Sequence, residues 1–150
     1  MNYEESITRF WQEFGTGRKM VLSASLNNIV TSRMMSVVVI DRCFYFQTDT
    51  LSRKYGQLTE NPHAALCSDN IQIEGICRET GHPMNDPAFC EAYQKAFPGS
   101  FTRYTSLKNE RLFRFEPSFI ERLLYIDGDP FIETIDITSK KYTFRKYDVN

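Results

Sequence analysis

The chain has 150 residues, of which 41% are hydrophobic and 25% are charged, as in an ordinary soluble globular domain. Its formal net charge of −1 produces no overall field that would attract nucleic acid or a membrane surface, so any anion site must be a local cluster. No apolar stretch approaches the roughly 20 residues that span a bilayer, and the N-terminus lacks a signal-peptide pattern. We therefore expect one cytoplasmic domain over residues 1–150.

Metal binding is not indicated by the four cysteines and two histidines of the chain. No two cysteines have the C-x-x-C spacing that is typical of zinc sites. Cys67 and Cys77 fall in strand-like stretches and Cys90 in a helix-like one, so free thiols are the favoured interpretation. The sequence thus predicts no metal ligands.

An amphipathic helix is predicted over residues 2–14, with Asn2 as its cap and Gly15 just past its end. Its apolar residues recur at the spacing of a single helix face. These residues are Ile7, Phe10, Trp11 and Phe14. Because aromatic side chains dominate burial in cores, we expect Trp11 to be a core anchor and not a ligand contact.

Three strands are predicted next, over residues 19–25, 29–40 and 43–48. Asn27-Asn28 and Asp41-Arg42 are turn sequences, so consecutive strands are expected to pair in antiparallel fashion. The second strand contains the unbroken run Val37-Val38-Val39-Ile40, which is typical of a strand covered on both faces.

Basic residues occur at two positions beside these strands. Arg33 lies near the start of the second strand, and Ser52-Arg53-Lys54 follows the third, where a helix over residues 53–60 begins. Paired strands bring both positions to neighbouring edges of one sheet, and a helix N-terminus adds unpaired N–H groups and a partial positive charge. We interpret this arrangement as a site for the phosphate group of a small cofactor.

The second half of the chain alternates between strands and one helix. Gly75 lies inside a predicted strand and indicates a bulge or a close approach to the backbone. A helix is expected from Pro87 to Phe97, and residues 99–109, which include Tyr104, are interpreted as a mobile loop over a site. The remaining predicted strands cover residues 64–68, 71–78, 111–116, 119–126, 131–137 and, as a candidate, 141–147.

Six to eight short strands, interrupted by two or three helices, predict an α+β domain built on a closed or nearly closed antiparallel barrel. Four short stretches follow one another in this order along the chain: RMMSVVV, FYFQT, SRK and ENPHAAL. This ordered set, within residues 19–78, resembles the FMN-binding split barrels related to pyridoxine 5′-phosphate oxidase. A weaker resemblance covers residues 113–129. The resemblance implies an antiparallel split barrel that binds FMN.

The resemblance also implies which residues bind the cofactor. Arg33, Arg53 and Lys54 would hold the FMN phosphate. Thr48 and Ser52 would add hydroxyl or backbone donors, with Gln47 beside them. The backbone of the strand segment Met34, Met35, Ser36 and Val37 would lie along the isoalloxazine edge.

One further contact and the assembly are implied in the same way. Asn70 falls near the position of a cofactor-contacting glutamine in the oxidases, although the alignment can slip to Gln72. The family is dimeric and holds each FMN between subunits, so a homodimer with FMN at the subunit interface is expected.

Two departures argue against oxidation of vitamin B6. Val38 occupies the position of a substrate-binding lysine, and the C-terminal segment lacks the Arg- and Trp-containing pattern of the true oxidases. The leading hypothesis is a small FMN-dependent oxidoreductase of unknown substrate that uses a small-molecule or nicotinamide donor. No catalytic side chain is identified.

Three alternatives remain open at this point. The first is a flavin-binding sensor or store without turnover. The second is a barrel that binds haem or a deazaflavin, for which His63 and His82 are the available imidazoles. The third is a barrel without a ligand that serves as an interaction module.

Overall fold

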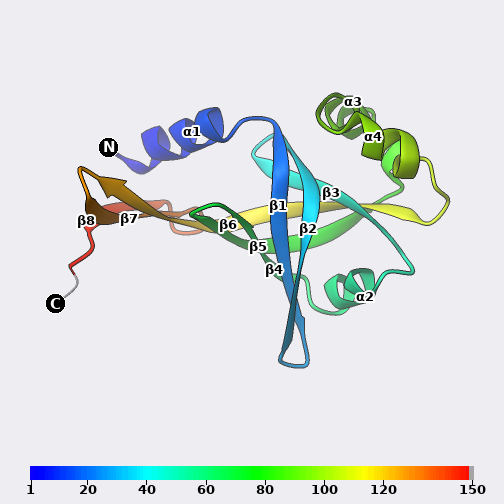
Figure 1. Ribbon diagram of the computed structural model, residues 1–150, viewed down its shortest axis with the longest axis horizontal. Coiled ribbons are helices and arrows are strands. Elements are labelled where there is room, and N and C mark those ends of the chain that lie inside the picture. Colours follow the sequence, from blue (N-terminus) through cyan, green and yellow to red (C-terminus); the bar gives the residue numbers. More distant parts are fainter. Residues whose placement is uncertain (149–150) are drawn as a thin grey trace.

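A computed structural model describes residues 1–148 of the chain (Figure 1). Within these residues, eight antiparallel strands follow the order β3-β2-β1-β4-β5-β6-β7-β8, and a further pairing of β3 with β6 closes six of them into a barrel. The strands are β1 Gly17–Leu26, β2 Ile29–Ile40, β3 Cys43–Asp49, β4 His63–Ser68, β5 Ile71–Gly81, β6 Glu110–Ile126, β7 Asp129–Asp136 and β8 Lys141–Lys146. The predicted antiparallel barrel is confirmed, and so is the candidate last strand.

The helices lie outside the barrel (Figure 1). In the described part of the chain, the longer helices are α1 Tyr3–Phe14, α2 Arg53–Glu60 and α3 Pro87–Ala96. Three short turns accompany them: η1 Pro83–Asn85, α4 Pro98–Ser100 and η2 Phe101–Thr105. The segment that the sequence presented as irregular is therefore mostly helical turns.

Local sequence explains where these elements begin and end. The Asn2 side chain accepts a hydrogen bond of 2.8 Å from the Glu5 N–H, which confirms the predicted cap of α1. Both predicted hairpin turns have positive φ at their two central residues, which Asn and Asp tolerate better than most residues do. The central residues of these turns are Asn27, Asn28, Asp41 and Arg42.

The prediction of two strands over residues 111–116 and 119–126 was wrong, because β6 is one strand of 17 residues. Pro117 and Ser118 lie between the two predicted strands, and proline cannot donate to a strand ladder. In the structure, Pro117 lies opposite Gly75, where the β5–β6 register shifts. A bulge is a place in a sheet that accepts proline, so the strand continues past it.

The barrel encloses a core of aromatic and aliphatic side chains. Phe44, Phe46 and Phe115 are fully buried, and Trp11 packs on Phe44 with ring centroids 5.1 Å apart. Trp11 is therefore an anchor at the core boundary, as expected. Val37 faces this core, whereas its neighbour Val38 belongs to a second cluster beneath α3. Both are 0% exposed, which confirms coverage on both faces at these two positions, whereas the first half of β2 is largely exposed.

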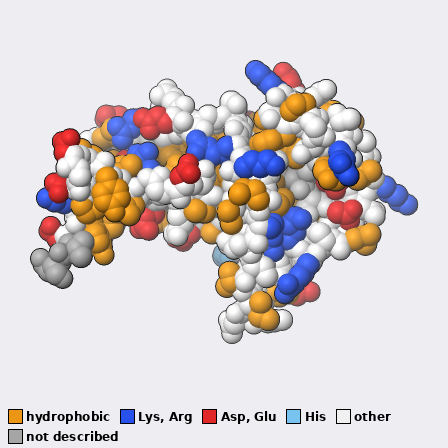
Figure 2. Space-filling view, viewed as in Figure 1, with side chains coloured by type: hydrophobic (Ala, Val, Ile, Leu, Met, Phe, Trp, Pro, Cys, Tyr) orange, Lys and Arg blue, Asp and Glu red, His pale blue; other side chains and the backbone are white. Residues whose placement is uncertain are grey.

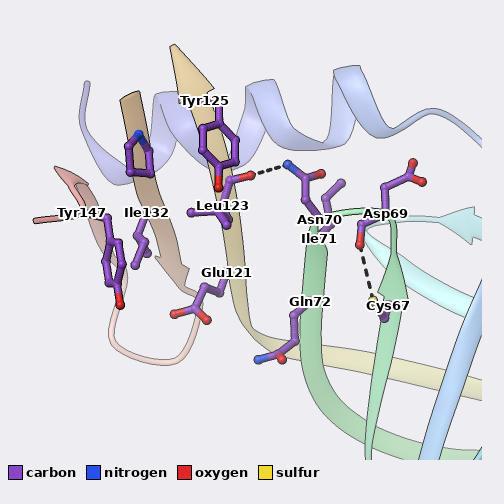
Figure 3. A pocket seen from close by; sticks show the side chains of 11 residues that line it. Cys67, Asp69, Asn70, Ile71, Gln72, Glu121, Leu123, Tyr125, Ile132 and Tyr147 are labelled. Atoms are coloured by element: carbon purple, nitrogen blue, oxygen red, sulfur yellow. Dashed lines mark hydrogen bonds between the residues drawn. The ribbon is translucent and has the colours of Figure 1, made fainter. Parts of the chain in front are cut away.

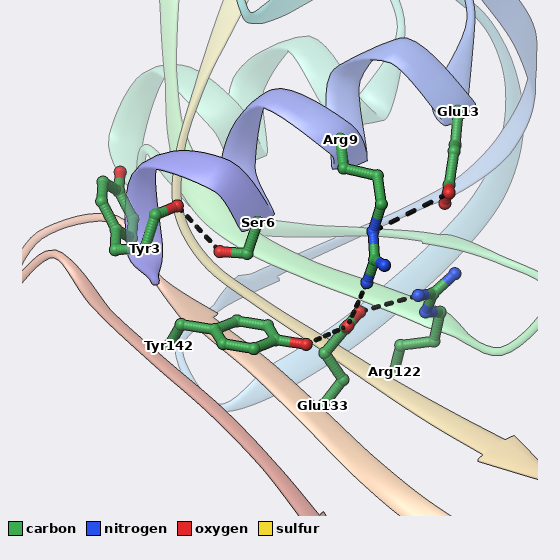
Figure 4. Close-up of polar contacts among 7 residues, drawn as sticks. All are labelled: Tyr3, Ser6, Arg9, Glu13, Arg122, Glu133 and Tyr142. Atoms are coloured by element: carbon green, nitrogen blue, oxygen red, sulfur yellow. Dashed lines mark hydrogen bonds and ion pairs between the residues drawn. The ribbon is translucent and has the colours of Figure 1, made fainter. Parts of the chain in front are cut away.

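Helix α1 is held against the β7–β8 extension by a buried carboxylate (Figure 4). Glu133 is 5% exposed and accepts hydrogen bonds from Arg122 at 2.8 Å and from the Tyr142 hydroxyl at 2.6 Å. Arg9 of α1 approaches the same carboxylate at 3.4 Å. Burial is the largest cause that raises the pKa of Tyr142 to about 12, followed by its hydrogen bond to Glu133. This network holds α1 on the β7–β8 extension, and none of its residues lines the cavity between β2 and β3.

The four cysteines form no disulfide bond within residues 1–148. Cys43, Cys67, Cys77 and Cys90 are all free in the structure, as predicted. Burial raises the pKa of the Cys77 thiol to about 12, so it stays protonated near neutral pH. No helix within residues 1–148 combines the length and the apolarity needed to cross a membrane.

Candidate flavin site

The barrel opens between β2 and β3. These strands pair only from Val38–Tyr45 to Ile40–Cys43, although β2 stays paired with β1 along its whole length. The stretch of β2 before Val38 therefore has an edge without a strand partner among the described residues. Backbone N–H and C=O groups on such an edge are available to a ligand.

A cavity of about 360 Å³ occupies this opening. Its walls come from the free edge of β2, the end of β3, the start of α2 and the segment from α3 to β6. The lining residues are Met34, Met35, Ser36, Gln47, Thr48, Asp49, Lys54, Tyr93, Ser100, Tyr104, Leu107 and Glu110. Six of the eleven predicted cofactor residues are thus in the wall of one cavity.

The predicted cations converge beside this cavity. Arg33 lies close enough to Lys54 for its charge to act on it. Burial is the main cause that lowers the pKa of Lys54, and Arg33 is the next. Burial also lowers the pKa of Arg33, and Arg53 contributes to that shift. In Figure 2, Lys and Arg side chains gather on the surface around β2 and α2. Cations from two separate elements, Arg33 on β2 and the neighbours Arg53 and Lys54 on α2, therefore share one corner of the barrel.

None of these three cations forms an ion pair with a carboxylate within residues 1–148. Arg33 donates to neutral oxygens only, namely Thr31 Oγ1 at 2.6 Å, Gln57 Oε1 at 3.0 Å and the Leu22 carbonyl at 3.4 Å. Glu110 and Asp49 oppose the fall in the pKa of Lys54, but neither forms an ion pair with it. Clustered positive charge that is not neutralised by an ion pair is the arrangement that an anion stabilises.

The N-terminus of α2 faces the same corner. Ser52 caps the helix by accepting from the Tyr55 N–H at 3.4 Å, and its own hydroxyl donates to the Asp49 carbonyl at 2.8 Å. Thr48 lies 3.0 Å from the Ser52 hydroxyl. Because the Ser52 proton is already used, what this turn offers to an anion is mainly the backbone N–H groups of the first helical residues.

Five of the eleven predicted residues are outside the lining of this cavity: Arg33, Val37, Ser52, Arg53 and Asn70. Arg53 lines a smaller pocket of about 270 Å³ beside α2. The Val37 side chain faces the barrel core, so only its backbone can lie along a ligand, as the prediction had it. Asn70 lies at the turn between β4 and β5, where its amide donates to the Leu123 carbonyl (Figure 3). Asn70 and Gln72 both line a different cavity, of about 520 Å³. Within one chain, neither joins the other predicted residues.

Sequence reasoning missed the far wall of the flavin-site cavity. Tyr93 was recognised only as part of the apolar stripe of α3, yet its hydroxyl interacts with Ser36 and Ser100, which opposes the burial that raises its pKa. Tyr104 and Leu107 come from the segment interpreted as a loop over a site, and the structure does place that segment over the cavity. The irregular sequence of residues 99–109, just after the predicted helix, was the feature that pointed to this wall.

Glu110 is a second residue without an obvious sequence signal. It begins β6, pairs with Asp49 and is 5% exposed. Burial is the main cause that raises the pKa of its carboxyl, and Asp49 adds to the rise, whereas Lys54 and His82 oppose it. A single glutamate at a strand start is common in any sequence, so nothing marked it in advance.

The amide oxygen of Gln47 is, within the described part of the chain, an unpaired hydrogen-bond acceptor in the wall of the cavity. Gln47 is 7% exposed, and its Oε1 atom is buried without a hydrogen-bond partner among residues 1–148. Leaving a buried acceptor unpaired costs about 1–3 kcal/mol. A ligand that donates to Gln47 Oε1 from inside the cavity would recover this cost.

The histidines offer little to a haem. His82 uses both ring nitrogens locally: Nδ1 accepts from the Met84 N–H at 3.1 Å, and Nε2 lies 2.8 Å from the Leu107 carbonyl. His63 is exposed on β4, outside the cavity. An axial bond from His82 would require one of these hydrogen bonds to break.

Solved structures with the same fold were found by comparison of coordinates. A pyridoxamine 5′-phosphate oxidase-related, FMN-binding protein from Nostoc punctiforme is 15% identical with a TM-score of 0.62, over 88% of this chain and 87% of that one. General stress protein 26 from Bacillus anthracis is 24% identical with a TM-score of 0.59, over 98% and 100%. An FAD-binding protein from Mesorhizobium loti is 10% identical with a TM-score of 0.55, over 69% and 83%.

Sequence comparison adds nothing to this, since no family model matches the chain and no curated protein matches it significantly. The similarity therefore lies in the fold. In this chain, six strands within residues 1–148 close into a barrel that opens between β2 and β3. The chain has the split-barrel fold of the pyridoxamine 5′-phosphate oxidase-related proteins.

Proposed function

We propose that the chain is an FMN-binding flavoprotein whose cofactor lies in the cavity between β2 and β3. The observation that carries this proposal is the convergence of Arg33, Arg53 and Lys54, without ion-pair partners in residues 1–148, beside that cavity. A terminal phosphate carries close to two negative charges, and arginine binds it through two parallel hydrogen bonds. Solved structures of this fold include FMN-binding and FAD-binding proteins.

The residues present fit a flavin. A volume of about 360 Å³ lies within the range of roughly 300–1,000 Å³ that is usual for cofactor sites. Gln47 Oε1 needs a donor, and a flavin ring carries an N–H group. The free edge of β2 supplies backbone groups for the polar side of the ring. Met35 and Tyr93 provide buried apolar surface.

The proposed activity is that of a small oxidoreductase with an unknown substrate and a small-molecule or nicotinamide donor. A bound flavin would supply the two-electron chemistry, so the protein has to supply placement and electrostatics. Arg33, Arg53 and Lys54 would fix the phosphate end, and the α3–η2 segment would cover the ring from water. Free thiols, including the exposed Cys67, suit a reducing compartment, so we place the protein in the cytoplasm.

A homodimer is part of this proposal. Asn70 is outside the flavin-site cavity of its own chain, so it can contact a flavin only if a second copy brings its Asn70 there. The uncovered face around Asn70 suits contact with another copy, because Leu123, Tyr125 and Tyr147 are exposed there. The prediction that Asn70 contacts the cofactor therefore depends on the prediction that the protein is a homodimer.

The proposal is tested by what co-purifies with the protein. We expect a yellow protein whose absorbance spectrum is that of a flavin and whose heat-released chromophore has the mass of FMN. Bleaching of that spectrum by NADH or NADPH, followed by reoxidation with a dye, would establish turnover; no bleaching would favour a store or sensor. A colourless protein that also fails to bind added FMN would contradict the proposal.

A further inference from the structure

Gln57 is a buried polar side chain of helix α2 and is only 5% exposed. Its Oε1 atom accepts hydrogen bonds from Thr31 Oγ1 at 2.9 Å and from Arg33 Nη2 at 3.0 Å. Both donors lie on β2, in the part of the strand that precedes its pairing with β3. Gln57 therefore joins the helix that carries Arg53 and Lys54 to the strand that carries Arg33.

Neutral oxygens hold the Arg33 guanidinium without neutralising its charge. Besides Gln57 Oε1, they are Thr31 Oγ1 at 2.6 Å and the Leu22 carbonyl at 3.4 Å. Because Thr31 also donates to Gln57, the atoms Gln57 Oε1, Thr31 Oγ1 and Arg33 Nη2 form a closed triangle of hydrogen bonds. A guanidinium has five N–H donors in one plane, so three acceptors leave at least two N–H groups for a ligand.

Two effects oppose this orientation of Arg33. The first is repulsion: after burial, the charge of Arg53 is the next cause that lowers the pKa of Arg33, and Arg33 acts in the same way on Lys54. The second is entropy, because a long side chain loses rotamer freedom when it is fixed in one place. A hydrogen bond from a charged donor to a buried acceptor counteracts both effects while no anion is bound.

We propose that Gln57 is a positioning residue for phosphate binding: its amide oxygen holds the Arg33 guanidinium beside the start of α2 before the phosphate arrives. This inference rests on the proposed function, in which that phosphate belongs to FMN. A carboxylate at position 57 would also orient Arg33, but it would neutralise the charge that the phosphate needs. A neutral amide orders the cation in advance and leaves its charge for the ligand, which favours binding.

The test measures FMN and riboflavin affinities of Gln57→Met by flavin fluorescence. Methionine has a similar length and helix propensity to glutamine but no amide oxygen. FMN affinity should fall about tenfold, as expected from the loss of one charged hydrogen bond that orders the site. Riboflavin affinity should stay level, because riboflavin has no phosphate. Gln12→Met, the same change at an exposed position of α1, should leave both affinities unchanged.

A double-mutant cycle separates positioning of Arg33 from general support of the fold. Arg33→Ala removes the group that Gln57 is proposed to position, so Gln57→Met should not lower FMN affinity further in that background. A loss of the same size in both backgrounds would mean that Gln57 supports the fold and would overturn the inference. Equal losses for FMN and riboflavin, or an unchanged FMN affinity in Gln57→Met, would overturn it as well.

A measurement without flavin distinguishes failure of this inference from failure of the proposed function. In the ligand-free wild type, the hydrogen bonds to Gln57 and Thr31 should restrict rotation of the Arg33 guanidinium and give separate ¹⁵N NMR signals for its Nη atoms. Arg33→Ala identifies these signals, and Gln57→Met should merge them. Merged signals in the wild type would overturn the inference. Separate signals in a wild type that binds no FMN would contradict the proposed function instead.

Discussion

Replacement of both Arg33 and Lys54 by alanine is expected to weaken FMN binding by about 3–6 kcal/mol, which is roughly a hundredfold to ten-thousandfold in Kd. The two cations approach the cavity from different elements, β2 and α2, and neither forms an ion pair within residues 1–148. Each is expected to contribute a charged hydrogen bond to one phosphate. Titration with FMN, followed by flavin fluorescence, measures the change.

Riboflavin provides the internal control for this experiment, because it has the same ring and ribityl chain but no phosphate. The double variant should bind riboflavin about as well as the wild type does. A matched control variant, Lys141→Ala with Arg145→Ala, removes the same charge from the exposed strand β8. That variant should keep full FMN affinity. Equal losses for FMN and riboflavin would mean that the two cations act through the fold and not through the phosphate.

Gly75→Ala is expected to destabilise the protein by at least about 3 kcal/mol. A Cβ atom at this position would lie 2.4 Å from Phe115 Cε1 and 2.5 Å from the Glu116 carbonyl oxygen. Phe115 is 0% exposed and packs on Phe44, so the ring cannot move aside without disturbing the core. Urea denaturation gives the change in free energy of unfolding.

Gly56→Ala is the matched control for this prediction. A Cβ atom at Gly56 meets nothing within 4 Å, and the residue lies inside helix α2. Alanine is the better helix former, so this variant should be stabilised by about 0.5–1 kcal/mol. Unfolding of Gly75→Ala at the urea concentration of the wild type would contradict the close approach of β6 to β5.

The convergence of Arg33 and Lys54 was predictable because local sequence determined it. Arg33 and Lys54 were identified by their positions relative to two strands and a helix start, and strand pairing then brought them together. Gly75 was likewise marked by its chemistry, since a glycine inside a strand often marks a close approach, and Phe115 provides it here.

The far wall of the cavity was not predictable in the same way. Tyr104 and Glu110 reach the cavity through the path of the chain after α3, and no local pattern determines that path. The prediction of two strands on either side of Pro117 was wrong because a bulge depends on the partner strand, which a single stretch of sequence does not reveal. Asn70 was proposed by alignment alone, and its own chain places it in another cavity.

The most direct test of the flavin site is a crystal structure of the protein with FMN. The account predicts the phosphate within hydrogen-bond distance of Arg33 and Lys54, the ring along the free edge of β2, and a donor of the ring or of a substrate facing Gln47. It also predicts Asn70 of a second copy near the ring. A flavin bound elsewhere, for example in the larger cavity beside Leu123, or a phosphate remote from both cations, would contradict it.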